Sequence, residues 1–273
     1  MWAFYRYFEC RKVKAALSGN LAYLEDMDGA DLRAFYTSPL GQSAAARLAQ
    51  GLQPRWSQAK DQLVLGLGFA HPLLERLSPG STMAHSFIMA RHGPSRWPEG
   101  AACRTALVDE HDLPLPDSKV DVLLVLHGLE LNDSPLDMLQ EAWRVLAPQG
   151  RIILIVPNRR GLWSASERNP FGHGQPFSRP QLAALLREAR LSPGWWREGL
   201  MMPPFRSAHM VRAAGAVEKP GARLLGHFGG VIMVEAVKQV YAFSPGKRAR
   251  RLVPRLSPVL VPRPASREST DTA

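Results

Sequence analysis

The chain of 273 residues contains only two cysteines, Cys10 and Cys103, so it carries neither a disulfide framework nor the paired cysteines of a zinc site. Its eight histidines show no HxxxH spacing, and we therefore expect no metal. The sequence also lacks a GxSxG motif and a Walker loop, the marks of α/β-hydrolases and P-loop proteins. Two free thiols are typical of a reducing compartment, and we expect a cytoplasmic protein.

No apolar run is long enough to span a membrane. The longest lies between Val120 and Leu131 and is interrupted by Asp121, His127 and Glu130, whereas a membrane helix needs about 20 apolar residues. Residues 1–14 contain no uncharged apolar run before a cleavage site. They carry the charged side chains Arg6, Glu9, Arg11, Lys12 and Lys14. A secretory signal is therefore not expected.

Composition divides the chain into three regions. Residues 1–27 form an N-terminal extension that we expect to be dispensable for folding, residues 28–243 alternate strand and helix signals, and residues 244–273 form a basic, proline-rich tail that we expect to be disordered. The formal net charge is +10, and residues 246–273 contribute seven basic against two acidic side chains, or +5. We therefore expect contact with nucleic acid or an anionic membrane only through this tail, weakening as salt rises.

The middle region predicts an α/β fold with a mostly parallel sheet, because strand and helix signals alternate along it. The near-continuous apolar run at 120–126 is the pattern of a central strand covered on both faces. The other apolar runs that predict strands lie at 62–67, 106–108, 151–156 and 231–237.

Caps and glycines mark the predicted helices. Ser38-Pro39 opens a helix that we expect to end before Gly51, and capping boxes are predicted at 134–137 and 178–181. A short helix is predicted over 71–77. The inner faces predicted for the two capped helices hold Leu136, Leu139, Trp143 and Leu146 in the first and Leu182, Leu185, Leu186 and Ala189 in the second.

The first predicted strand ends in a glycine-rich turn, Gly66-Leu67-Gly68-Phe69-Ala70-His71. Small residues at such a turn allow the backbone to approach a ligand closely. The turn is similar to a GxGxxG dinucleotide fingerprint, but His71 stands at the third glycine and no acid follows at the usual spacing of about 20 residues. A tight strand-to-helix turn without a ligand is the alternative interpretation.

Two later segments are more specific. Residues 108–117 read VDEHDLPLPD and precede the strand at 120–126, and residues 141–151 read EAWRVLAPQGR and lead into the strand at 151–156. In order and spacing these segments resemble the class I S-adenosylmethionine-dependent methyltransferases, in particular the type 11 methyltransferase domains, which show LPFPD and RVLKPGG at these places. The resemblance covers residues 63–191.

This resemblance implies a Rossmann-like methyltransferase fold with a mostly parallel seven-stranded sheet, an antiparallel last strand and helices on both faces. It implies S-adenosylmethionine as the cofactor and transfer of its methyl group to an acceptor that the sequence does not name. An active enzyme is favoured by the order of the motifs. A non-catalytic S-adenosylmethionine-binding or regulatory protein on the same fold is the alternative, because fold does not guarantee function.

The cofactor-binding residues that the resemblance implies are Gly66, Gly68, Ala70, Asp109, Glu110, His127 and Gly128. The first three would line the turn under the cofactor's amino acid and sugar, the two acids would lie near the adenine, and the last two would face the methionyl side and the methyl group. His127 is also the candidate general base, with a satisfied buried histidine as the alternative.

Two acids that the family usually carries are missing. One normally stands where this chain has Gly66 and helps to hold the cofactor's amino group. The other normally grips the ribose hydroxyls at the end of the second strand, where residues 87–91 offer no acid. These departures support the non-catalytic alternative.

Residues 158–177 form a loop that is long for a compact domain, and we expect it to cover the acceptor site. Arg159, Arg160, Trp163 and His173 could grip an anionic or aromatic acceptor from this loop. The alternative is a solvated basic loop in which Trp163 is a packing anchor.

Overall fold

The computed structural model describes residues 28–56, 62–78, 83–98, 100–204 and 229–240. The predicted N-terminal extension and basic tail lie outside these described residues, and the boundaries at 27 and 243 stay predictions. Within the described ranges, no helix has the length and apolar character needed to cross a membrane.

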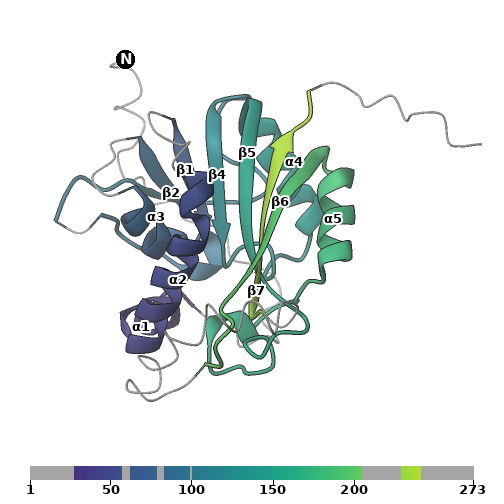
Figure 1. The fold of residues 1–273 in the computed structure, drawn as a ribbon. Coiled ribbons are helices and arrows are strands. Elements are labelled where there is room, and N and C mark those ends of the chain that lie inside the picture. The colour runs from purple at the N-terminus through teal and green to yellow at the C-terminus, as the bar shows by residue number, and fades with distance from the viewer. Residues whose placement is uncertain (1–27, 57–61, 79–82, 99, 205–228, 241–273) are drawn as a thin grey trace, which may run out of the picture. The chain divides into compact units, whose positions relative to one another are not determined.

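A seven-stranded sheet forms the centre of the described chain, in the order β3-β2-β1-β4-β5-β7-β6 (Figure 1). The strands are β1 (Val64–Gly68), β2 (Ala84–Met89), β3 (Thr105–Val108), β4 (Val120–Leu126), β5 (Leu146–Pro157), β6 (Leu191–Gly199) and β7 (Val231–Lys238). Strand β1 pairs in parallel with β2 and β4, β2 pairs in parallel with β3, and β4 with β5. Strand β7 runs antiparallel to both β5 and β6. The predicted mostly parallel sheet with an antiparallel last strand is confirmed.

Helices cover both faces of this sheet (Figure 1). The helices are α1 (Gly29–Thr37), α2 (Pro39–Trp56), α3 (His71–Leu77), α4 (Pro135–Val145) and α5 (Arg179–Glu188), with 3-10 turns η2 (Ala90–His92) and η3 (Pro170–Gly172). Leu124 and Leu126 of β4 pack in the cluster that contains α1, α2 and α3, whereas Leu123 and Val125 pack in the cluster that contains α4 and α5. This alternation explains the near-continuous apolar run of β4, because both of its faces are buried.

Helix α2 begins at Pro39 as predicted, but the prediction that it ends before Gly51 is wrong, since the helix continues to Trp56. Gly51 is buried, and a side-chain carbon at this position would lie 3.0 Å from Cε of Met233 on β7. The glycine therefore permits close packing of α2 against the sheet and does not end the helix.

Helix α4 begins at Pro135 as predicted, but Ser134 makes no side-chain capping bond within the described chain, so the predicted capping box with Asp137 is wrong. The backbone N–H of Ser134 instead donates to Oδ1 of Asn132 at 2.7 Å. In the second capping box, which is confirmed, the backbone N–H of Ser178 donates to Oε1 of Gln181 at 3.1 Å.

The inner faces of α4 and α5 are confirmed in part. Leu139 is buried, whereas Leu136 and Trp143 are only partly buried. Leu146 is buried as well, but it lies in β5 and not on the helix, because α4 ends at Val145. The buried face of α4 is completed by Met138, Ala142 and Val145. On the α5 side, buried Leu182, Leu186 and Ala189 match the prediction, and Leu185 is partly buried.

Strands β1 and β4 lie side by side where the strand order reverses direction. Gly68 is paired with Leu126 at their carboxyl ends, and the backbone N–H of Phe69 donates to the Leu126 carbonyl at 2.7 Å. Open parallel sheets bind ligands outside the carboxyl ends of their strands at such a reversal. The fold therefore predicts a ligand site at the residues that follow β1, β2 and β4.

Candidate cofactor site

The glycine-rich turn after β1 is closely packed against the end of β4. Gly68 has a φ of 83°, and a side-chain carbon there would lie 2.3 Å from the Leu126 carbonyl oxygen. A side-chain carbon at Gly66 would lie 2.7 Å from Cβ of Ala70, which is fully buried. Neighbouring protein atoms therefore account for both glycines, and their predicted place under the cofactor stays a prediction.

Two buried histidines follow β1 and β2. His71 stacks on Trp97, with ring centroids 5.8 Å apart and planes inclined by 4°. Burial lowers the pKa of His71 to about 4 and that of His92 to about 3, so both rings are neutral at pH 7. Within the described chain, Nε2 of His71 and both ring nitrogens of His92 have no hydrogen-bond partner.

His127 directly follows β4 and has a φ of 52°. Its Nε2 lies 2.8 Å from the hydroxyl of Tyr36, which α1 brings into the core. Burial, and then the charge of Glu130, raise the pKa of Tyr36 well above its ordinary value of 10. The hydroxyl therefore stays protonated, and it lies within hydrogen-bond distance of Nε2 of His127.

Glu130 lies beside His127 and is as deeply buried as the core leucines. Its Oε1 is 3.3 Å from Nδ1 of His127, and its side chain is 0% exposed. Neither carboxylate oxygen forms a hydrogen bond with the described residues, and neither does Nδ1 of His127. The adjoining Gly128 is buried against Val125 and Met89.

Six buried polar atoms without hydrogen bonds thus belong to residues that follow β1, β2 and β4. They are Nε2 of His71, Nδ1 and Nε2 of His92, Nδ1 of His127, and Oε1 and Oε2 of Glu130. Buried polar groups in native proteins are nearly always hydrogen-bonded to protein, water or a ligand. The amino, carboxylate and hydroxyl groups of S-adenosylmethionine fit this set, because they offer both donors and acceptors.

The two acids predicted to lie near the adenine occupy different surroundings. Asp109 is exposed, whereas Glu110 is buried. Oε1 of Glu110 forms a 2.8 Å ion pair with Nη2 of Arg91 and accepts from the Asn132 amide at 3.2 Å. Arg91 also donates to the Leu131 carbonyl oxygen. A cation paired with Glu110 therefore stands just after β2, where the family has its ribose-binding acid.

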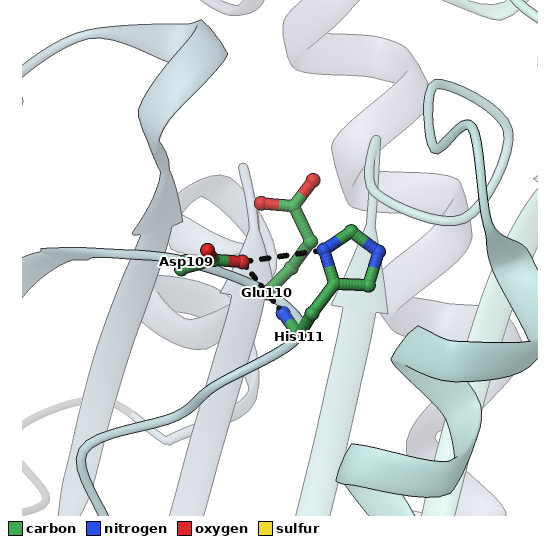
Figure 2. A group of neighbouring side chains, drawn as sticks. All are labelled: Asp109, Glu110 and His111. Carbon is green, nitrogen blue, oxygen red and sulfur yellow. Dashed lines mark hydrogen bonds and ion pairs between the residues drawn. The ribbon is translucent and has the colours of Figure 1, made fainter. Parts of the chain in front are cut away.

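Asp109, Glu110 and His111 form a group whose side-chain ligand atoms lie within 4.8 Å of one another (Figure 2). Figure 2 shows His111 joined to Asp109, through its backbone N–H at 2.9 Å and Nδ1 at 3.2 Å. Nε2 of His111 lies 3.2 Å from Oδ1 of Asn132, so both ring nitrogens have partners. The group is a hydrogen-bonded turn with Glu110 already paired, and the expectation of no metal stays a prediction.

Of the four side chains in the loop at 158–177 that were predicted to contact the acceptor, only some are accessible to solvent. Arg159 and Arg160 are exposed, and half-buried His173 has Nε2 2.7 Å from the Glu167 carbonyl oxygen. Trp163 is fully buried, and its ring N–H donates to the Met202 carbonyl at 2.6 Å. This burial favours the packing-anchor interpretation for Trp163 over a grip on the acceptor.

Tyr36, Arg91, Glu130 and Phe171 contact the site although sequence reasoning gave them no role. The Phe171 ring, in η3, lies 4.7 Å from the His127 ring. Tyr36 is 91 positions from its partner His127, so no local pattern could connect them. Of these four residues, only Glu130 could have been identified as a site residue from the sequence, because it is a charged residue inside an apolar stretch, three positions after His127.

Comparison with known proteins finds similarity to methyltransferases. Residues 83–154 match the family model described as a methyltransferase domain. The demethylmenaquinone methyltransferase of Deinococcus radiodurans is 29% identical over 154 residues, which cover 54% of this chain and 62% of that protein. The chain therefore spans less than two thirds of the length of this relative.

Solved structures share the fold at low sequence identity. A Thermotoga maritima S-adenosylmethionine-dependent methyltransferase, described as a possible histamine N-methyltransferase, is 14% identical with a TM-score of 0.52, covering 77% of this chain and 96% of that one. An Aquifex aeolicus S-adenosylmethionine-dependent methyltransferase is 16% identical with a TM-score of 0.51, covering 78% and 99%. The resemblance predicted from the sequence is confirmed: residues 83–154 match a methyltransferase domain, and the described chain shares the fold of these S-adenosylmethionine-dependent methyltransferases.

Proposed function

We propose that the chain binds S-adenosylmethionine beyond the carboxyl ends of β1, β2 and β4 and transfers its methyl group to an acceptor beside the loop at 158–177. The observation that carries the proposal is the set of six buried polar atoms without hydrogen bonds at these strand ends. The methyltransferase-domain match over residues 83–154 supports a methyl donor as the ligand.

The cofactor supplies an electrophilic methyl group when it is bound. The task of the protein is then to position the acceptor and to exclude water, which can supply roughly 7–11 kcal/mol of a barrier. Phe171 and Trp163 anchor the loop at 158–177 in the core, and exposed Arg159 and Arg160 offer charge to an anionic acceptor. His127 as a general base belongs to the same proposal and is required only for an acceptor that holds its proton tightly.

A non-catalytic binding or regulatory protein is the second candidate. It is favoured by the ion pair of Arg91 with Glu110, which places a cation where the family carries its ribose-binding acid. Cofactor binding is common to both candidates, and only methyl transfer separates them. A cytoplasmic location and contact of the basic tail with nucleic acid or anionic lipid also stay proposals; the exposed free thiol of Cys103 supports the first.

Calorimetric titration of the full chain tests the proposal. We expect S-adenosylmethionine and S-adenosylhomocysteine each to bind at one site per chain, because both molecules carry the amino, carboxylate and hydroxyl groups that would pair with the buried polar atoms. Heat of dilution alone, from protein whose circular dichroism shows it to be folded, would reject the proposal. If both bind, transfer of a labelled methyl group to candidate acceptors then distinguishes an enzyme from a binding protein.

A further inference from the structure

Two neighbouring acids follow β3, and the structure gives them different positions. Asp109 is exposed and is hydrogen-bonded to His111 of the same turn. Glu110 is buried, and its Oε1 is bonded to Arg91 after β2 at 2.8 Å and to the Asn132 amide after β4 at 3.2 Å. Figure 2 shows the Glu110 carboxylate pointing away from the Asp109–His111 pair. The Glu110 carboxylate is therefore joined to the residues that follow β2 and β4, although its backbone belongs to the turn after β3.

Arg91 holds the Glu110 carboxylate at the end of β2. It stands two positions after Met89, the last residue of β2, and its Nη1 donates to the Leu131 carbonyl oxygen. A hydrogen bond between a guanidinium and a carboxylate is strong and directional, because both groups are charged. Residues 87–91 offer no acid of their own where the family has its ribose-binding acid. The ion pair thus brings a carboxylate from β3 to the strand end that lacks one.

One oxygen of the Glu110 carboxylate remains for a ligand. Both contacts use Oε1, and among the described residues Oε2 has no hydrogen-bond partner. The Glu110 side chain is 7% exposed, and Oε2 is not one of the fully buried polar atoms without a bond, so solvent reaches it, unlike the oxygens of Glu130. An ionised carboxylate only accepts hydrogen bonds, and each of its oxygens has about two lone-pair sites. Oε2 can therefore accept from two adjacent donors, such as the neighbouring hydroxyls of a ribose.

We propose that Glu110 binds the ribose hydroxyls of S-adenosylmethionine and that Arg91 is the residue that positions it. The ribose-binding acid of this chain is then supplied from β3 and not from β2. The inference rests on the proposed function and adds to it, because it assigns the ribose contact to a residue for which the resemblance implies a place near the adenine. Asp109 alone is left as the acid predicted to lie near the adenine.

The test compares ligands that differ at one end of the nucleoside. S-adenosylhomocysteine is the reference. Its 2′-deoxy and 3′-deoxy analogues each lack one ribose hydroxyl, and its inosine analogue has an oxygen in place of the adenine amino group. We define the ribose preference as the affinity for S-adenosylhomocysteine divided by that for the weaker-binding deoxy analogue. In calorimetric titrations of the full chain we expect a ribose preference of about tenfold or more, the value of one hydrogen bond to a charged group.

Glu110→Gln removes the charge and keeps the shape of the side chain. It should reduce the ribose preference to less than about threefold, because a neutral amide is a weaker acceptor. The preference for S-adenosylhomocysteine over the inosine analogue should stay as in the wild type. A folded Glu110→Gln protein that keeps the ribose preference, or that loses the preference over the inosine analogue, would overturn the inference, since Glu110 would then not contact the ribose alone.

Arg91→Met tests the positioning role, because methionine fills part of the same space without a charge. The ribose preference should fall towards that of Glu110→Gln, whereas Arg91→Lys keeps a cation and should retain more of it. The double variant with Glu110→Gln should lose no more than Glu110→Gln alone, because Arg91 acts only through Glu110. A further loss in the double variant would show that Arg91 contacts the ligand itself. The matched control is Glu188→Gln on α5, an exposed position at which neither preference should change.

The wild type separates this inference from the proposed function. Binding of S-adenosylhomocysteine without a ribose preference would overturn the inference and leave the proposed function standing, whereas no binding of S-adenosylhomocysteine or S-adenosylmethionine would overturn both. Should Glu110→Gln fail to fold, Glu110→Asp keeps the charge on a shorter side chain that withdraws the carboxylate from the ribose. An unchanged ribose preference in Glu110→Asp is then the contradicting result.

Discussion

Replacing Trp163 by alanine is expected to lower the free energy of unfolding by about 3–5 kcal/mol, the range seen when a buried aromatic side chain is truncated. The Trp163 side chain is fully buried, packs edge-on against Phe171 at 5.7 Å, and donates its ring N–H to the Met202 carbonyl. A side-chain carbon at Gly230 would lie 2.2 Å from Cδ1 of Trp163, so the indole fills the space beside β7. Urea unfolding followed by circular dichroism measures the change.

Two further variants separate the contributions of the Trp163 ring and its N–H group to this loss of stability from that of an exposed neighbour. Trp163→Phe keeps a ring and removes the N–H donor, so it should cost only about 1–3 kcal/mol for the unsatisfied Met202 carbonyl and the smaller ring. Leu162→Ala changes the neighbouring side chain, which is 56% exposed, and should stay within about 0.5 kcal/mol of wild type. If Trp163→Ala lowers the free energy of unfolding by less than about 1 kcal/mol, Trp163 is not a packing anchor. The alternative interpretation, in which Trp163 contacts the acceptor, would then be favoured.

Replacing Gly68 by alanine should cost at least about 3 kcal/mol of stability, for two separate reasons. The φ of 83° is unfavourable for any residue with a side chain, and the new carbon would lie 2.3 Å from the Leu126 carbonyl oxygen. Because β1 and β4 are adjacent in the sheet, the contact cannot be relieved without separating their carboxyl ends. Thermal and urea unfolding of the variant measure the loss.

Gly93→Ala isolates the conformational part of this loss. Gly93 has a φ of 67°, and a side-chain carbon there meets nothing within 4 Å. We expect it to cost about 1–2 kcal/mol, the price of the left-handed conformation alone. Equal losses at the two glycines would show that the close approach of β4 to Gly68 has no energetic consequence.

Much of the fold follows from local patterns in the sequence. The apolar run of β4, the proline starts of α2 and α4, and the Ser178–Gln181 box each identify an element without reference to the rest of the chain. The predicted end of α2 before Gly51 is wrong, because the sequence does not distinguish a glycine that ends a helix from one that permits packing, here against Met233. Strand β6 has no clear signal in the sequence, because among the described strands it pairs only with β7 and most of its residues are half-buried.

The candidate site was less predictable, because its contacts join distant parts of the chain. The resemblance located the turns after β1, β3 and β4, and the structure places Glu110 and His127 in buried polar surroundings there. It could not foresee that Arg91 would neutralise Glu110, or that Tyr36 of α1 would reach His127. The fully buried Trp163 was predicted only as one of two alternatives, since a loop sequence does not reveal which aromatic side chain turns inward.

The central claim is that the cofactor binds beyond the carboxyl ends of β1, β2 and β4, and mapping of backbone amide chemical shifts tests it most directly. The isotope-labelled full chain would be titrated with S-adenosylhomocysteine, which binds without turnover. The largest shift changes are predicted at residues 66–71, 90–92, 109–111 and 127–130, with little change along β6 at 191–199. Changes centred on β6, or no changes at saturating ligand in a folded chain, would contradict the claim.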